Sequence, residues 1–474
     1  MALKHLALGA AMLSVSNIIR LLLQFVTLPV LARFLTPDEY GIVGIAMPFI
    51  LFAQIFSDGG VAQSLVRENN DGGVAWSSVF WIITAIGCVA ALLLIATAPV
   101  VAIEFGEPTL RPVIGTLGIV CIAQALTVVP SASLQRAHRF SSLALADISA
   151  AILGAAIAVA LAVNQFGPWA LVGQQLAVWL SKAVLVWAIA GFRPKLVLRL
   201  AATEAHLRFS RDVITFGVIN FFARALDPLV IGKTFGASVV GTYSIASQLM
   251  RLPAMIVTGP IQSVFYTHVT RRKAQKKQLK TALLLTSRLI AIGVFPFMGL
   301  IAAGHEPLFR LLLSEKWAAS GTIFMLFAAV GSVQAVTGLN GGILMATNRT
   351  GTQIRFTTEF TTIWLVTLLV AVRLGVAWIP VAYTVSWFLY FPRFARMFLS
   401  GIDCSTIEYV STMALPALAT IGSVALYLGV VNSCSLSDLE KLALVSALVL
   451  LAIALGGLLQ ANRIRGELQD LERS

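Results

Sequence analysis

The sequence predicts an all-α integral membrane protein with about fourteen transmembrane helices. Of its 474 residues, 58% are hydrophobic and only 12% are charged, which is too little charge to cover the surface of a soluble domain of this length. The apolar stretches are long and continuous and lack the short alternating pattern of membrane β-strands, so helices are expected. Lys and Arg residues also concentrate in alternate connections, as they do in multi-pass proteins.

The apolar stretches are separated by charged residues or by Pro and Gly, and each has about the length that a bilayer requires. The first stretch follows the short start M-A-L-K-H. No A-x-A-like cleavage site follows it, so we interpret it as a span and not as a removed signal peptide. The expected spans cover residues 11–33, 40–62, 76–103, 110–133, 143–163, 167–191, 210–235, 240–267, 281–303, 321–345, 355–373, 376–399, 409–430 and 440–462.

The distribution of positive charge predicts the orientation of the chain. Both tails and one set of alternate connections carry 22 Lys and Arg residues, whereas the opposite set carries 7. By the positive-inside rule, both termini are expected in the cytoplasm. The same rule explains most of the net charge of +13, and no nucleic-acid partner is predicted.

The chain repeats itself at an offset of about 200 residues. Residues 30–46 read VLARFLTPDEYGIVGIA and residues 230–246 read VIGKTFGASVVGTYSIA, so that Gly41 aligns with Gly241. A weaker match at an offset of 210 aligns Arg139 with Arg349. With six spans per copy, both copies cross the membrane in the same direction and leave a substrate path between them.

This repeat predicts four parts of the chain. An N-terminal six-helix lobe covers residues 1–191, and a cytoplasmic inter-lobe linker at 192–211 is expected to lie on the membrane surface as an amphipathic segment. A C-terminal six-helix lobe covers 212–400. Two additional helices and a cytoplasmic tail cover 401–474.

The connection after the first span predicts a tight helix start. Thr36 suits the N-cap, Pro37 suits the first helical position, and Glu39 is placed as the capping-box partner. The second span should therefore begin directly after a short turn, whatever the protein transports.

Polar residues inside the first span predict a face that lines a cavity, because charged side chains are costly in lipid. Asn17, Arg20, Gln24 and Thr27 follow one another at spacings of three, four and three residues. These spacings keep all four on one side of a helix.

The seventh span carries a matching face with Asn220, Arg224 and Asp227, which the offset of 200 aligns with the first. Arg251 adds a cation on the eighth span, and Lys182 is placed in the sixth. The predicted substrate-binding residues are Arg20, Arg224, Arg251, Gln24, Asn17, Asn220 and Lys182. The competing interpretation is that these groups are hydrogen-bonded or ion-paired between helices.

The predominance of arginine on these faces favours an anionic cargo. A guanidinium binds phosphate oxygens in a fork geometry, whereas a cationic drug requires a carboxylate. Asp227 is the one deep carboxylate on these faces and lies three residues after Arg224. We therefore predict that Asp227 pairs with Arg224 and couples transport to an ion gradient.

Other charges inside the predicted spans are interpreted as lying nearer the membrane surface. Arg288 and Asp147 are expected to snorkel to the cytoplasmic interface. Asp58 and Glu359 are expected near helix ends.

No catalytic site, metal site or cofactor is predicted. The four cysteines form no C-x-x-C, and the sequence contains neither H-E-x-x-H nor a phosphate-binding G-x-x-x-x-G-K-[ST] loop. No connection is much longer than about 20 residues, which argues against an integral-membrane polymerase or glycosyltransferase with an extramembrane active site. Energy is expected from an ion gradient, from substrate supply or from a partner.

Three segments resemble the polysaccharide-exporter (O-antigen and exopolysaccharide flippase) branch of the multidrug/oligosaccharidyl-lipid/polysaccharide exporter superfamily. They are LPVLARFLTPDEYGI at 28–42, SDGGVAQSLVR at 57–67 and DPLVIGKTFGASVVGTYSIA at 227–246. The resemblance implies two pseudo-symmetric six-helix lobes that form a V around a central cavity, followed by two C-terminal helices.

The resemblance also implies a cargo. A flippase of this branch carries polyprenyl-pyrophosphate-linked oligosaccharide from the cytoplasmic to the periplasmic leaflet for polysaccharide export. It works among the lipids of the bacterial inner membrane and beside polysaccharide polymerase and export machinery. Lipid II flippases and multidrug cation antiporters share the fold, so an ion-coupled multidrug antiporter is the alternative function.

Overall fold

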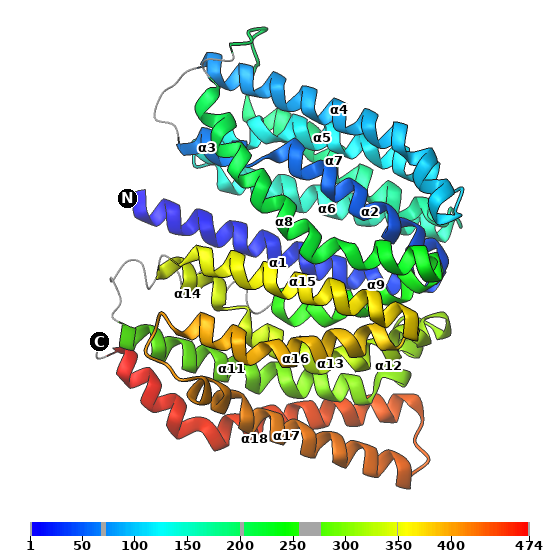
Figure 1. Cartoon of the computed structure of the whole chain (residues 1–474), viewed down its shortest axis with the longest axis vertical. Helices are drawn as coiled ribbons and strands as arrows, with labels where there is room; N and C mark the ends of the chain where they lie inside the picture. The colour runs from blue at the N-terminus through cyan, green and yellow to red at the C-terminus, as the bar shows by residue number, and fades with distance from the viewer. Residues whose placement is uncertain (1, 68–72, 200–202, 256–275, 348, 473–474) are drawn as a thin grey trace. The chain divides into compact units, whose positions relative to one another are not determined.

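The computed structural model describes residues 2–67, 73–199, 203–255, 276–347 and 349–472. Over these residues the chain is helical and contains no strand. It divides into two compact units, Met1–Gly241 and Thr242–Ser474, and the boundary between them falls in the green part of the chain in Figure 1.

In the first unit, the buried helix α5 organises the packing. It contacts α2, α4 and α7, while α1 packs against α6, and Figure 1 shows α4 and α5 side by side along their lengths. The helices are α1 (Ala2–Phe34), α2 (Pro37–Asp58), α3 (Val61–Arg67), α4 (Gly73–Phe105), α5 (Leu110–Arg136), α6 (Phe140–Val163), α7 (Trp169–Ala190), α8 (Glu204–Phe235) and the start of α9 (Ala237–Pro253).

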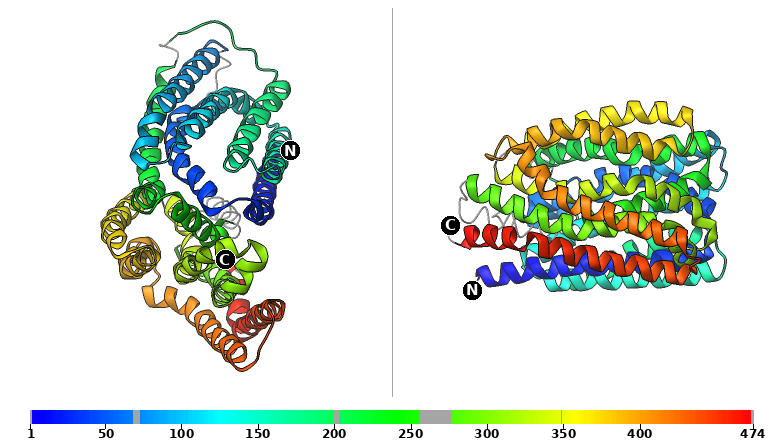
Figure 2. Two further views of the ribbon diagram at one scale, coloured as in Figure 1. Left: turned by 90° about the vertical axis from the view of Figure 1, so that its right-hand side faces the viewer. Right: turned by 90° about the horizontal axis from the view of Figure 1, so that it is seen from below.

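In the second unit, α11 has the corresponding central place. It packs against α13, α17 and α18, while α15 pairs with α16, and the hairpin of α17 and α18 is visible in both views of Figure 2. The helices are α11 (Lys276–Ala303), α12 (His305–Leu312), the 3-10 turn η3 (Glu315–Trp317), α13 (Ala318–Thr337), α14 (Asn340–Ala346), α15 (Thr350–Leu374), α16 (Trp378–Leu399), α17 (Thr406–Ser433) and α18 (Asp438–Glu472).

The buried share of two pairs of spans that the repeat aligns can be compared, and one pair differs. In an 18-residue apolar window of the fourth and tenth spans, α5 and the α13–α14 segment, 61% of the residues are buried. In the corresponding windows of the third and ninth spans, α4 and α11, the buried share is 39% and 61%. Helices α17 and α18 lie against α11, so the two helices outside the repeat account for the extra burial of α11.

The predicted start of the second span is confirmed. The Thr36 hydroxyl accepts a hydrogen bond from the Glu39 amide at 3.3 Å, and the Glu39 carboxylate accepts one from the Thr36 amide at 2.7 Å. Pro37 is the first residue of α2. This reciprocal capping satisfies two backbone donors that a helix start otherwise leaves open.

The two glycines that the repeat aligns contact each other. A β-carbon on Gly41 would lie 1.7 Å from the carbonyl oxygen of Ala237, and one on Gly241 would lie 1.9 Å from that of Pro37. The backbones at the starts of α2 and α9 therefore approach more closely than any other residue type permits.

The predicted all-helical membrane fold is confirmed, whereas the count of fourteen stays a prediction. Each expected span overlaps a long helix. Over the described residues, eleven helices are long and apolar enough to cross a membrane, or twelve if α8, which bends between Phe222 and Ala225, is one span. Helices α9 and α16 are not among these eleven. Helix α9 is described only as far as Pro253, and α16 carries two arginines.

The linker predicted at 192–211 is not one amphipathic segment. Residues 191–199 are not helical and bind the first turns of α4, where the Trp81 ring nitrogen donates to the Lys195 carbonyl at 2.9 Å. The Ser78 hydroxyl donates to the Val197 carbonyl at 3.1 Å. Residues from Glu204 onward already belong to α8, because this helix begins before the apolar stretch predicted at 210–235.

Candidate functional site

The first predicted polar face lies on α1. Asn17, Arg20 and Gln24 are exposed, whereas Thr27 is 5% exposed and donates its hydroxyl hydrogen to the Leu23 carbonyl at 2.7 Å. Three of the four residues are thus free to meet a ligand. An exposed guanidinium within a membrane-spanning helix requires water or an anion beside it, since lipid solvates it poorly.

The second predicted face lies on α8. Asn220 and Asp227 are half-buried there, while the side chain of Arg224 lies outside the described part of the chain. The predicted Arg224–Asp227 contact therefore stays a prediction. On α9, Arg251 is exposed and its Nη2 donates to the Ser247 hydroxyl at 3.2 Å, one turn earlier.

Lys182 is already paired. Its ammonium lies 2.7 Å from the Asp147 carboxylate, which joins α7 to α6, and the two side chains are 20% and 13% exposed. The ammonium also lies 5.5 Å from the centre of the Trp179 ring. Lys182 is therefore a weaker candidate than Arg20 for binding the cargo. Asp147 binds Lys182 on the neighbouring helix α7 and does not snorkel to the membrane interface as predicted.

The prediction that Arg288 snorkels to the interface is wrong. The residue is 5% exposed on α11, and its Nη2 lies 2.9 Å from the Glu467 carboxylate of α18. Its Nη1 donates to the Gln460 side chain at 2.7 Å. Because α18 covers this part of α11, the guanidinium is sealed into the bundle and paired there.

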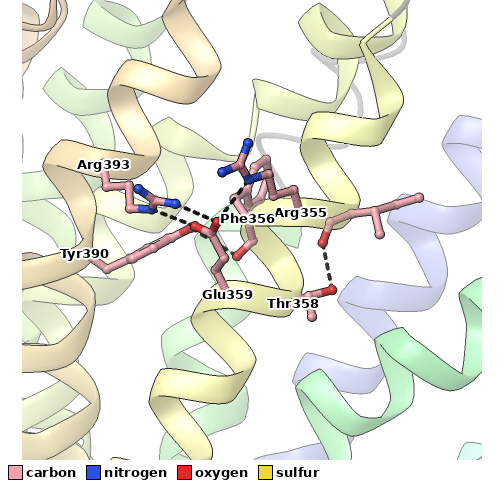
Figure 3. A network of polar contacts seen from close by, with 7 residues as sticks. Arg355, Phe356, Thr358, Glu359, Tyr390 and Arg393 are labelled. Atoms are coloured by element: carbon pink, nitrogen blue, oxygen red, sulfur yellow. Dashed lines mark hydrogen bonds and ion pairs between the residues drawn. The ribbon is translucent and has the colours of Figure 1, made fainter.

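A polar cluster on α15 and α16 had no predicted role. Figure 3 shows that Arg393, Arg355 and Tyr390 converge on Glu359. Arg393 donates from Nε and Nη2 to the two carboxylate oxygens at 2.7 Å each, Arg355 donates from Nε at 3.1 Å, and the Tyr390 hydroxyl donates at 2.9 Å. In the sequence, the spacing of four residues between Arg355 and Glu359 was the available signal.

The described basic side chains of the spans fall into two groups. Lys182 and Arg288 have carboxylate partners that neutralise them. Arg20 and Arg251 have no carboxylate partner among the described residues, and Arg355 shares one with Arg393. The second group retains charge and free N–H groups that can bind phosphate oxygens.

Comparison with known proteins identifies the family. The profile of a family described as polysaccharide biosynthesis protein matches residues 30–322. The succinoglycan biosynthesis transport protein ExoT of Rhizobium meliloti is 28% identical over 65% of this chain and 62% of its own length, so the chain spans less than two thirds of ExoT. The lipopolysaccharide biosynthesis protein WzxC of Escherichia coli is 24% identical over 73% of this chain and 71% of WzxC. The teichuronic acid biosynthesis protein TuaB of Bacillus subtilis is 22% identical over 81% of each chain.

Two solved structures show the same fold. The lipid II flippase MurJ in an inward closed conformation aligns with a TM-score of 0.77 and 13% identity over 97% of this chain and 100% of MurJ. An inward-facing multidrug resistance MATE family transporter of the MOP superfamily aligns with a TM-score of 0.55 and 14% identity over 85% and 98%. The chain is thus a multi-pass membrane protein with a transporter fold. Since the family profile covers more than half of it, the chain belongs to the polysaccharide biosynthesis protein family, and the resemblance found in its sequence is confirmed.

Proposed function

We propose that this chain is a transporter that carries lipid-pyrophosphate-linked oligosaccharide from the cytoplasmic to the periplasmic leaflet for polysaccharide export. Membership of the polysaccharide biosynthesis protein family supports the role, and so does the name of ExoT as a succinoglycan biosynthesis transport protein. MurJ, which shares the fold, is named a lipid II flippase.

The observation that carries the proposal is the exposed polar face of α1. Arg20 stands between Asn17 and Gln24 on a membrane-spanning helix. A pyrophosphate offers several acceptor oxygens to such a guanidinium, and the two amide side chains can bind sugar hydroxyls. Arg224 and Arg251 extend the proposed site, with Asn220 and Lys182 as further contributors.

The alternative cargo, an organic cation, finds less support. A cation requires a free carboxylate, yet Asp147 and Glu359 each bind a basic side chain at 2.7 Å. Asp227 is assigned the coupling role, in which cargo phosphate displaces it from Arg224 and it then exchanges a proton. The MATE fold keeps a multidrug antiporter as the second candidate.

The proposal includes the architecture expected from the sequence. Lobes 1–191 and 212–400 alternate access to a shared site, with 192–211 as the linker and 401–474 as two additional helices. Both termini lie in the cytoplasm of a bacterial cell, and the chain works in the inner membrane beside a polysaccharide polymerase and export machinery.

The test uses a cell that depends on this chain for glycan export. Arg20→Ala and Arg224→Ala should abolish export while the amount of folded protein in the membrane stays normal, and lysine at either position should restore part of it. The matched control is Arg111→Ala, which removes an exposed arginine at the start of α5 and should leave export unchanged.

Full export by the Arg20→Ala, Arg224→Ala double variant would end the proposed phosphate-binding role. Loss of the folded protein would instead show that the arginines are structural. Altered resistance to cationic drugs, with normal export, would favour the antiporter.

A further inference from the structure

Among the described residues, each unit of the chain has one carboxylate–cation pair that joins two consecutive long helices. Asp147 of α6 binds Lys182 of α7 at 2.7 Å, and Glu359 of α15 binds Arg393 of α16 at 2.7 Å. The base follows the acid by 35 residues in the first pair and by 34 in the second. The two pairs therefore occupy equivalent places in the repeat.

The helix starts support this equivalence. Arg139 is the N-cap residue of α6 and Arg349 is that of α15. These are the two arginines that the repeat aligns at an offset of 210. The fifth and eleventh spans therefore begin alike, and each carries its carboxylate two to three turns later.

The second pair differs because it has an additional cation. Arg355 lies four residues before Glu359 on α15 and donates to the carboxylate that Arg393 already holds in a fork. Tyr390 donates a fourth hydrogen bond to the same group (Figure 3). Two guanidinium groups thus share one carboxylate, and one positive charge remains uncompensated.

This remaining charge is accessible. The side chains of Arg355 and Arg393 are 66% and 52% exposed, whereas that of Glu359 is 25% exposed. Both Nη groups of Arg355 and Nη1 of Arg393 make no hydrogen bond with any residue that the structure describes. These N–H groups lie on two neighbouring helices and can bind one tetrahedral anion together.

The cluster lies toward one common end of the two helices. At a rise of 1.5 Å per residue, Glu359 is about 13 Å from the start of α15 and Arg393 is about 9 Å from the end of α16. A helix of this length extends beyond the hydrocarbon core by only a few ångströms at each end, so the long arginine side chains must extend from within the core to reach the headgroups of the nearer leaflet. Basic side chains between helices at this level bind anionic lipid headgroups.

We propose that Arg355 and Arg393 form a binding site for the phosphodiester headgroup of an anionic phospholipid, with Glu359 and Tyr390 as the groups that orient the two guanidiniums. The charge decides the class of lipid. A phosphodiester such as that of phosphatidylglycerol carries one negative charge, which matches the single uncompensated positive charge. A pyrophosphate carries more charge, and it would have to displace Glu359.

The first unit provides an internal comparison. Asp147 and Lys182 match one carboxylate with one ammonium and are largely buried. That pair has no uncompensated charge for a lipid, so its role is to join α6 to α7. The proposed lipid site therefore belongs to the second copy alone, where Arg355 accompanies the repeated pair.

The test measures which lipids the purified full-length chain retains. The chain is placed in nanodiscs with equal amounts of phosphatidylglycerol and phosphatidylcholine, and the bound lipids are counted by native mass spectrometry. We expect phosphatidylglycerol to be retained at least about fivefold over phosphatidylcholine, as one basic contact at the surface provides. Arg355→Ala should remove this preference, and Arg355→Lys should keep part of it.

Arg396→Ala is the matched control. Arg396 is exposed on α16 and, among the described residues, its Nε donates to the Pro392 carbonyl of its own helix at 3.3 Å, so the preference should persist without it. Equal losses in Arg355→Ala and Arg396→Ala would show general attraction to a basic surface and would overturn the site. Glu359→Gln adds one positive charge to the cluster, and we expect it to retain phosphatidylglycerol.

Two further outcomes decide the proposal. If the wild-type chain retains both phospholipids equally, the proposal is wrong even if Arg355→Ala fails to fold. In a second arm, a polyprenyl pyrophosphate is added at the same mole fraction as phosphatidylglycerol. Displacement of phosphatidylglycerol by this lipid would assign the site to the cargo and overturn the phospholipid assignment, whereas retention would support it. Neither arm depends on glycan export.

Discussion

Alanine at Gly41 or at Gly241 should force the starts of α2 and α9 apart. The added β-carbon would meet the carbonyl oxygen of Ala237 at 1.7 Å in the first case and that of Pro37 at 1.9 Å in the second. Neither oxygen can rotate away, because both belong to the backbone. To reach the 3.4 Å of ordinary contact, the helices have to separate by about 1.5 to 1.7 Å.

The expected loss of stability follows from two opposing effects. Overpacking of a well-packed contact typically costs about 1–3 kcal/mol. A change from Gly to Ala within a helix normally stabilises by about 0.5–1 kcal/mol. We therefore expect a net loss of roughly 1–2 kcal/mol for each substitution, and less than the sum for the double variant, since the first substitution already separates the backbones.

The assay is the midpoint of thermal unfolding of the purified protein in detergent, compared at one scan rate because such unfolding is commonly irreversible. Gly293→Ala is the matched control. Gly293 lies in α11, and a β-carbon there meets no atom within 4 Å, so its midpoint should stay unchanged or rise. Midpoints of Gly41→Ala and Gly241→Ala at or above that of Gly293→Ala would refute the close approach of the two helix starts.

Two further predictions concern the second unit. Glu467→Ala should lower the thermal midpoint by the equivalent of about 3 kcal/mol or more, because it leaves the 5% exposed Arg288 guanidinium without its carboxylate. Recovery of the midpoint in the Arg288→Met, Glu467→Leu double variant would support this reason. An unchanged midpoint in Glu467→Ala would contradict it. In spheroplasts, a membrane-impermeant maleimide should label exposed Cys434 between α17 and α18 but not Cys404, as expected if both termini are cytoplasmic. Burial raises the pKa of the Cys404 thiol to about 11. After permeabilisation, Cys404 should therefore react slowly with the maleimide near neutral pH and faster as the pH rises. Labelling of Cys404 in intact spheroplasts would reverse the predicted orientation.

The sequence by itself determined the class of fold and several local structures. Long apolar stretches can satisfy their backbone groups in lipid only as helices or as a closed barrel, and their length and continuity were enough to predict the all-helical fold. The start of α2 was equally readable, because Thr36 and Glu39 cap the helix within a single turn. The polar face of α1 was also predictable, because residues at helical spacing share a side whatever surrounds the helix.

Only the tertiary structure decided what the charges inside the spans do. From the sequence alone, Arg288 and Asp147 were expected to snorkel to the membrane surface, but their partners are Glu467 on α18 and Lys182 on α7. The same holds for Glu359, whose strongest partner lies on α16. A pattern along one helix reports the faces of that helix alone, whereas an ion pair depends on which helices are neighbours and on how deeply they bury the charge. Packing of the whole bundle sets both, and so it decides which cations are neutralised and which remain free to bind phosphate.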